Sequence, residues 1–223
     1  MNRQIAFIDF DGTITTRDSL LEFIKFSKGR LRFYLGFLIN SPWLLAYRAG
    51  IISNQVGKDR ILTWFFGGAP LNTFQDTCDR FAATAIPDLV RPKALREIRQ
   101  LQEKGVEVVV VSASPANWLQ KWTEETGVAL LATRLQTRDQ PACPPKPRLQ
   151  TRDQPAVPQP GHSVTTRLTG KILGRNCHGE EKVRRIRESY DLPSYDRIIA
   201  YGDSSGDKPM LALATNAFFK PFR

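Results

Sequence analysis

Short apolar runs alternate with amphipathic stretches along most of the chain. The run VEVVVVSAS at 106–114 is apolar and β-branched almost throughout, which is typical of a central strand covered on both faces. Helical spacing predicts helices over 93–104, 115–122 and 179–190. The apolar runs that predict strands are 4–9, 106–114, 128–135, 197–203 and 217–219. Strands that alternate with helices predict an α/β fold with a parallel sheet.

The block between the first two predicted strands has a different pattern. From about Ser19 to Ala85 apolar residues recur at helical spacing, with prolines and glycines as interruptions. Because this block separates two strands of one sheet, we expect it to be an insertion. The predicted division is a core of residues 1–17 plus 86–223 and a helical cap of residues 18–85.

A tandem repeat interrupts the predicted core. RLQTRDQPACPPKP at 134–147 is followed directly by RLQTRDQPAVPQPG at 148–161, and residues 137–166 hold seven of the fifteen prolines. We expect an extended, disordered loop of polyproline character, because lengthening a surface loop costs only ~0.6 kcal/mol per doubling. The repeat is either a duplication without a role or a docking segment for a partner that binds proline-rich peptides.

Charge favours anionic partners without choosing among them. Lys and Arg number 32 against 22 Asp and Glu, for a net charge of +10, which suits phosphorylated metabolites, anionic lipid headgroups or nucleic acid. Residues 23–58 carry six basic side chains and no acid, around the apolar runs FYLGFLI and WLLAY. These runs are shorter than the ~20 residues of a spanning helix. They predict either short helices packed in the cap or an apolar, basic surface resting on an anionic membrane.

Cysteine usage and the N-terminal sequence bear on location. The three cysteines are scattered without CxxC spacing, and no apolar leader precedes the first strand. We therefore expect a cytoplasmic protein, with the inner face of the membrane as an alternative.

Two carboxylates follow the first predicted strand. In Asp9-Phe10-Asp11-Gly12-Thr13, residues i and i+2 can point into one crevice at the carboxyl end of a parallel sheet, where α/β proteins bind ligands. Two carboxylates there repel each other unless a cation lies between them or one takes up a proton. Oxygen ligands suit Mg²⁺, so we expect a magnesium site.

Three further features occupy equivalent places at strand or helix ends. Asp203 and Asp207 follow the strand at 197–203 and can complete the magnesium site. Ser112 ends the strand at 106–114, where a hydroxyl and backbone N–H groups suit a phosphate oxygen. Lys182 begins a helix, where its ammonium can offset phosphate and carboxylate charge. Each feature alone is weak, but together they predict a site for Mg²⁺ and phosphate.

With these motifs the sequence resembles the haloacid dehalogenase-like (HAD) hydrolase superfamily, specifically its phosphoserine-phosphatase-like subfamily IB. The resemblance extends from Ile5 to about Phe219, except for the proline-rich repeat. It implies a Rossmann-like parallel-sheet core with an α-helical cap inserted after the first strand.

The resemblance also implies roles for the motif residues. Asp9 would be the nucleophile that forms an aspartyl-phosphate, and Asp11 the general acid and then base. Lys182 would stabilise Asp9 and the phosphate, although in many relatives the lysine stands at the position of His178. The implied phosphate ligands are Ser112 and the N–H of Ala113. The implied Mg²⁺ ligands are Asp9, the Asp11 carbonyl, Asp203 and, through water or Lys182, Asp207.

The substrate is less defined than the chemistry. By position, Asp18 and Arg60 correspond to the residues that meet the amine and carboxylate of phosphoserine in phosphoserine phosphatases. The apolar, acid-free stretch 23–58 instead resembles relatives that act on lipid-linked phosphates such as phosphatidylglycerophosphate. Both substrate classes stay open, as a small phosphorylated metabolite or a lipid-headgroup phosphate.

Three classes of function follow from these observations. The leading one is a Mg²⁺-dependent phosphomonoester hydrolase. The alternative is a peripheral membrane or adaptor protein that uses the basic apolar cap and the proline-rich loop, with vestigial catalysis. Nucleic-acid binding is suggested only by net charge and lacks a recognised module. Oligomeric state is not indicated by the sequence.

Overall fold

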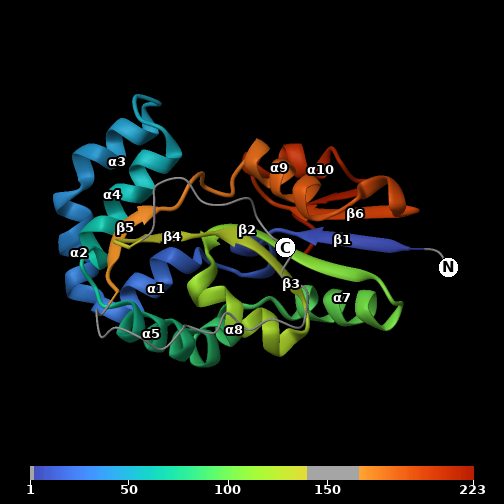
Figure 1. Cartoon of the computed structure of the whole chain (residues 1–223), viewed down its shortest axis with the longest axis horizontal. Coiled ribbons are helices and arrows are strands. Elements are labelled where there is room, and N and C mark those ends of the chain that lie inside the picture. Colours follow the sequence, from blue (N-terminus) through green and yellow to red (C-terminus); the bar gives the residue numbers. More distant parts are fainter. Residues whose placement is uncertain (1–2, 140–165) are drawn as a thin grey trace.

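The computed structural model describes residues 3–139 and 166–223, so the prediction made for the proline-rich repeat lies almost wholly outside the described residues. A five-stranded sheet forms the centre of the core, in the order β3-β2-β1-β6-β7, with every neighbouring pair parallel (Figure 1). The α/β prediction is confirmed. The strands are β1 (Gln4–Ile8), β2 (Glu107–Pro115), β3 (Ala129–Thr133), β6 (Arg197–Gly202) and β7 (Asn216–Phe219).

Helices cover both faces of this sheet. The core helices are α6 (Ile86–Leu89), α7 (Pro92–Glu103), α8 (Ala116–Thr126), α9 (Glu180–Ser189) and α10 (Lys208–Leu211), with 3₁₀ turns at Leu192–Ser194 and Ser205–Asp207. Alternate residues of β1 and β2 point to opposite faces. Ile8 and Val110 pack on the α7 and α8 side, whereas Phe7 and Val109 pack on the α9 and α10 side. Burial on both faces explains why these strands are continuous apolar runs.

The block between β1 and β2 is helical, as predicted. It contains α1 (Ser19–Lys28), α2 (Arg30–Ile39), α3 (Ser41–Arg48), α4 (Asn54–Phe66) and α5 (Leu71–Thr84). Phe23 of α1 stacks on Trp118 of α8 with ring centroids 4.6 Å apart, and it meets Phe74 and Phe81 edge to face. The base of the cap and the core therefore share one hydrophobic interior.

The apolar run 128–135 is not a single strand, so that prediction is wrong in part. The chain leaves the main sheet at Arg134, and β4 (Leu135–Thr137) pairs antiparallel with β5 (Leu168–Ile172). This pair lies against α4: Thr63 donates a hydrogen bond to the Gly170 carbonyl at 3.2 Å. A side chain at Gly170, which has φ +78°, would collide with the Thr63 backbone, so glycine permits the close approach.

Within residues 3–139 and 166–223 no helix is both long enough and apolar enough to cross a membrane. The 3₁₀ turn at Ser205–Asp207 and the irregular turn at Phe10–Ile14 both follow strands at their carboxyl ends. These two turns and the end of β2 bring the predicted site residues to one edge of the sheet.

Candidate active site

The turn after β1 presents Asp9 at the carboxyl edge of the sheet. Its carboxylate is buried, and Oδ2 accepts a hydrogen bond from the Thr13 hydroxyl at 3.1 Å. The turn passes through Gly12 at φ +81°, where a Cβ would lie 2.5 Å from Oδ2 of Asp203. Glycine is thus required twice, for the left-handed backbone and for contact with the second acidic turn.

Lys182 of α9 is buried among acceptors. Its Nζ donates to Oδ1 of Asp9 at 2.6 Å, to Oδ1 of Asp207 at 2.7 Å and to the Val111 carbonyl at 2.8 Å. Burial acts to lower the pKa of Lys182, but the two carboxylates outweigh it and hold this pKa above its ordinary value. Lys182 is therefore a fixed positive charge. His178 lies instead against Gly206, which has no side chain to exclude the imidazole.

Asp207 is used to organise the second acidic turn. Its Oδ2 accepts hydrogen bonds from the backbone N–H of Asp203 at 3.1 Å and of Ser204 at 2.9 Å, and from the Ser204 hydroxyl at 2.8 Å. Burial acts to raise the pKa of Asp207, but Lys182 and these hydrogen bonds bring it below the ordinary value. With both oxygens engaged, Asp207 orients Lys182 and Asp203.

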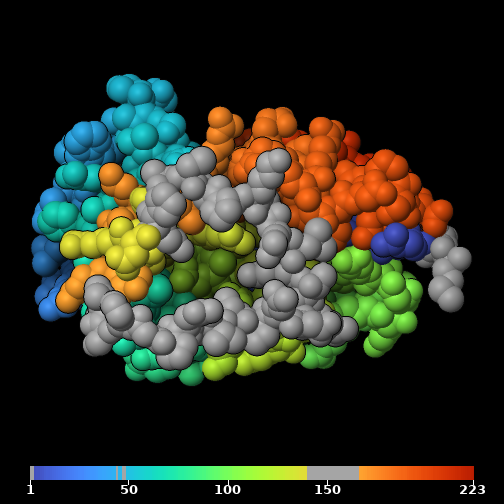
Figure 2. Space-filling view, in the orientation of Figure 1, coloured from blue at the N-terminus to red at the C-terminus, as the bar shows by residue number. Residues whose placement is uncertain are grey.

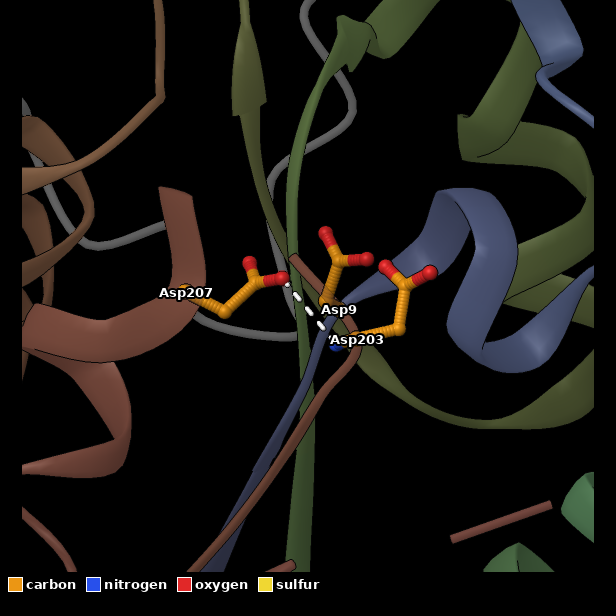
Figure 3. Close-up of side chains that lie close together, drawn as sticks. All are labelled: Asp9, Asp203 and Asp207. Carbon is orange, nitrogen blue, oxygen red and sulfur yellow. Dashed lines mark hydrogen bonds between the residues drawn. The ribbon is translucent and has the colours of Figure 1, made fainter. Parts of the chain in front are cut away.

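The carboxylates of Asp9, Asp203 and Asp207 converge. One ligand atom from each lies within 4.8 Å of the others, and Figure 3 shows Asp9 between the two aspartates of the second turn. Burial raises the pKa of Asp9 to about 7, against the attraction of Lys182 and with added repulsion from Asp207. The three carboxylates exceed the Lys182 ammonium by two negative charges, of which the half-exposed Arg223 guanidinium partly offsets one, so the cluster can attract a divalent cation. The oxygen donors fit Mg²⁺.

Asp203 also has an ion-pair partner. Nη2 of Arg223 lies 2.6 Å from its Oδ2, and half of the Arg223 side chain is exposed. Burial and the Asp207 charge raise the pKa of Asp203, although Arg223 opposes this effect. Arg223 therefore partly offsets the negative charge of a carboxylate that belongs to the acidic cluster.

Asp11 is held apart from this cluster by two donors. Oδ1 accepts from the Ser19 N–H at 2.7 Å and Oδ2 from the Ser114 hydroxyl at 2.6 Å. Ser19 Oγ in turn donates to Ser114 at 3.0 Å and accepts from Trp118 Nε1 at 3.2 Å. The Asp11 carboxyl is therefore fixed between the start of α1 and the end of β2. The predicted role of its carbonyl as a metal ligand stays a prediction.

The predicted phosphate ligands lie at an irregular strand end. Ser112 is fully buried, and its hydroxyl accepts from the Ser114 N–H at 3.0 Å. The pairing of β2 with β3 shifts register between Ser112 and Pro115. Ala113 lies within this irregular stretch, beside Ser112 and opposite the Asp9 turn, so the predicted pair is at the site.

The two predicted substrate residues occupy different positions. Asp18 is the N-cap of α1, where its Oδ1 accepts from the Leu21 N–H at 3.1 Å. Arg60 packs within the cap: its Nε donates to Asn40 at 3.2 Å and its guanidinium lies 5.2 Å from the Trp43 ring centroid. Substrate contact by either residue stays a prediction.

A residue that the sequence analysis did not single out reaches the site from the cap. Nζ of Lys58 on α4 donates to the Ala113 carbonyl at 2.8 Å. Burial lowers the pKa of Lys58, while the carboxylates of Asp11 and Asp18 act to raise it. Residues two apart on a helix face different sides, so Lys58 and Arg60 cannot both point to the core.

Sequence comparisons with known proteins gave matches over most of the chain. A family model described as haloacid dehalogenase-like hydrolase matches residues 6–155 and 159–212. Protein CicA of Caulobacter vibrioides is 32% identical over 222 residues, covering 98% of this chain and 86% of CicA.

Two solved structures with the same fold are also informative. A protein of unknown function from Bordetella pertussis superimposes with a TM-score of 0.73 at 19% identity, covering 96% of this chain and 88% of that one. A substrate-bound phosphoserine phosphatase superimposes with a TM-score of 0.57 at 17% identity, covering 98% of this chain and 86% of that one.

Proposed function

The chain belongs to the haloacid dehalogenase-like hydrolase family, and from that membership and the geometry of its site we propose that it is a Mg²⁺-dependent phosphomonoester hydrolase. The substrate class is a small phosphorylated metabolite or a lipid-headgroup phosphate. Its placement in subfamily IB is part of the same proposal, supported by a phosphoserine phosphatase among the solved structures that share the fold.

One observation carries the proposal. The buried carboxylate of Asp9 is fixed by Lys182 at 2.6 Å and by Thr13 at 3.1 Å, at the edge where Asp203 and Asp207 converge. A structural salt bridge needs one carboxylate for one ammonium. Carboxylates in excess of the ammonium, with the pKa of Asp9 raised to about 7 by burial and by repulsion from Asp207, are instead typical of a site that binds a cation.

In the first half of the reaction Asp9 acts as nucleophile. A carboxylate oxygen forms a bond to phosphorus while the bond from phosphorus to the leaving oxygen breaks, which yields an aspartyl-phosphate. Asp11, fixed by Ser19 and Ser114, gives its proton to the leaving oxygen. Lys182 stabilises the added charge on the phosphoryl group. Bound Mg²⁺ supplies further positive charge so that an anion can approach the phosphate dianion.

In the second half Asp11 acts as base. It takes a proton from a water molecule, whose oxygen bonds to phosphorus as the bond to Asp9 breaks, and inorganic phosphate leaves. General acid–base catalysis of this kind contributes about 10²–10⁴-fold. Splitting the reaction into two steps lets one carboxyl group serve as acid and then as base.

The cap supplies the second wall of the site. Lys58 of α4 reaches the Ala113 carbonyl, next to the predicted phosphoryl ligand Ser112, so its ammonium stands where a substrate anion would enter. We assign Lys58 as the residue of α4 that binds the substrate anion, with Asp18 as a further predicted contact; Arg60, two residues along the helix, points away from the core. A cap held over the reacting groups also excludes water from the first step.

The test is Mg²⁺-dependent hydrolysis of an aryl phosphate by the full chain. We expect turnover that chelator abolishes and that Asp9→Asn lowers at least about 10³-fold, because the nucleophile is lost. Asp88→Asn is the matched control, since it makes the same chemical change at an exposed position. Mg²⁺-dependent turnover that survives in Asp9→Asn would refute the mechanism.

The covalent step and the substrate class need separate measurements. Acid quenching during turnover of a substrate labelled on its phosphoryl group should trap label on the wild-type chain and none on Asp9→Asn. A panel of phosphorylated metabolites and phospholipids then distinguishes the two substrate classes by kcat/KM.

A further inference from the structure

Helix α2 turns its apolar side outward. Leu31, Tyr34, Leu35 and Leu38 follow the i, i+3, i+4, i+7 spacing of one helix face, and they are 48 to 74% exposed. A helix on the surface of a soluble domain ordinarily shows polar residues at these positions. The reversed arrangement marks the face as one that contacts something outside the chain.

The opposite side of α2 is already occupied. Phe33 and Gly36 are buried, and a Cβ at Gly36 would collide with the Phe65 ring of α4. Asn40 ends the helix with its amide bonded to the Gly36 carbonyl at 2.8 Å. Because α2 is packed tightly on this side, rotation to bury the leucines would break the existing packing.

The apolar surface continues beyond α2. Figure 1 places α2 and α3 together at the end of the molecule opposite β6, and Figure 2 shows this blue and cyan end forming the outer surface of the cap. We call this surface the cap face. Its exposed apolar residues are Leu31, Tyr34, Leu35, Leu38, Ile39, Trp43, Leu45 and Ile51.

The charge around the cap face has one sign. Residues 23–58 contain no acid, and Arg30 and Arg32 are exposed on α2. The bordering acids are engaged elsewhere: Glu22 pairs with Lys25 at 2.8 Å, and Asp59 accepts from the Ile172 N–H at 2.8 Å. The face is therefore apolar with a positive rim.

From this combination we propose that the cap face docks on an anionic membrane surface, with α2 lying in the plane of the interface. Apolar side chains enter the boundary between headgroups and acyl chains, and arginines remain at the level of the lipid phosphates. The exposed apolar residues of α2 take no part in the proposed chemistry, so docking does not depend on the proposed function.

A second copy of the chain fits the face less well. Association of two cap faces would bring Arg30 and Arg32 of both copies together, and no acid within 23–58 could compensate them. Anionic lipid supplies the opposite charge. With no helix of the described residues able to cross a membrane, docking would be peripheral and reversible.

The experiment measures co-sedimentation of the full chain with vesicles. Vesicles of phosphatidylcholine alone are compared with vesicles of phosphatidylcholine and phosphatidylglycerol, at low and high salt. The expected result is binding to the anionic vesicles that weakens at high salt. In the double variant Leu35→Glu, Leu38→Glu the partition coefficient should fall at least about tenfold, because two apolar anchors are lost.

A charge-matched control separates position from net charge. Thr73→Glu with Gln100→Glu lowers the net charge by the same two units at exposed sites on α5 and α7, and should retain most of the binding. The double variant Arg30→Gln, Arg32→Gln should weaken binding to the vesicles that contain phosphatidylglycerol and should not change binding to the vesicles of phosphatidylcholine alone. Hydrolysis of a soluble aryl phosphate by the leucine double variant reports that its fold and site are intact.

Three results would overturn the proposal. They are absence of vesicle binding by the wild type, equal loss of binding in the cap-face variant and its charge-matched control, and lipid-free self-association that the leucine double variant abolishes without any vesicle binding. The last result would assign the cap face to an interface between two copies.

Discussion

Lys58 and Arg60 differ in what their side chains contact. Lys58 donates to the Ala113 carbonyl beside the predicted phosphoryl ligands, whereas the exposed Arg60 contacts Asn40 and Trp43 of the cap. Both are cations on α4, so substitution of each by an uncharged residue of similar length separates a charge at the site from a charge in the cap.

We predict that Lys58→Met raises KM for a phosphomonoester about tenfold or more and changes kcat less, because a hydrogen bond to a charged group contributes about 1.5–3 kcal/mol. Arg60→Met is the matched variant and should change KM less than about threefold. Steady-state kinetics at saturating Mg²⁺ measure KM and kcat for both variants and for the wild type. Equal increases in KM for both variants would show that Lys58 has no special position.

In the proposed mechanism Ser114 acts on the reaction through Asp11. Its hydroxyl is one of two donors that fix the Asp11 carboxyl, at 2.6 Å. We predict that Ser114→Ala lowers kcat about tenfold with KM nearly unchanged, because misplacing an acid–base group costs rate and not substrate affinity. Ser114→Thr keeps the hydroxyl and should recover part of the loss. An unchanged kcat in Ser114→Ala would contradict this role.

At the scale of elements, the seam between α4 and β5 depends on one glycine. Gly170 has φ +78° and faces the Thr63 backbone, whereas Gly105 has φ +72° with open space where its side chain would be. Both positions are strained for alanine, but only the first is crowded. Comparing them isolates the cost of the contact.

We predict that Gly105→Ala lowers the free energy of unfolding by about 1 kcal/mol, from left-handed strain alone. Gly170→Ala should lower it by about 2 kcal/mol more, since the methyl group must push α4 and β5 apart. Urea denaturation of both variants measures the difference. If both variants lost the same free energy of unfolding, α4 and β5 could move apart without cost.

The elements also show where sequence patterns suffice. The strands β1, β2 and β6 are buried on both faces, so each is a continuous apolar run that can be predicted locally. The run 128–135 predicts one strand, because Arg134 alone does not interrupt an apolar pattern, whereas the structure has two strands there. What ends β3 is the pairing of Leu135 with Ile172, a contact far along the chain with no local signal.

The candidate site likewise contains residues that can be predicted from the local sequence and residues that cannot. Asp9 and Asp203 follow predicted strands, so sheet topology alone brings them to one edge. Lys58 could not be chosen from the sequence, because six basic residues lie in 23–58 and only the tertiary placement of α4, which packs against β5, decides which one reaches the end of β2. The sequence does not distinguish Ser114 from Ser112, because both place a hydroxyl near the end of the strand.

At the scale of the whole molecule, the buried acidic cluster couples stability to pH. Burial raises the pKa of Asp9 to about 7 and raises that of Asp203, so the folded metal-free protein binds more protons than the unfolded chain above about pH 4. The contribution of these two carboxyl groups to stability therefore falls as pH rises from about 4 to about 7, whereas His178, whose pKa burial lowers, contributes in the opposite direction. Lys182 stays charged throughout this range and contributes no slope.

We predict that metal-free wild type melts at a lower temperature than Asp9→Asn at pH 8, while the two differ little near pH 4. Added Mg²⁺ should raise the melting temperature of the wild type more at pH 8 than at pH 5, because deprotonated carboxylates bind the cation. Thermal unfolding with chelator and with Mg²⁺ measures both effects, and Asp88→Asn should follow the wild type. A wild-type melting temperature equal to or above that of Asp9→Asn at pH 8 in chelator would contradict the assignment.

The start of α4 is tied to the segment that leads into α9. Gln55 donates from Nε2 to the Gly174 carbonyl at 2.8 Å, and Asn54 accepts from the Asn176 amide at 2.7 Å. That segment continues directly to the helix of Lys182. A tilt of the outer cap must either rupture these amide links or pull on the lead-in to the lysine helix. A movement of the outer cap would therefore shift the Lys182 ammonium beside Asp9. In the proposed mechanism this couples the entry of substrate beneath the cap to the position of that charge.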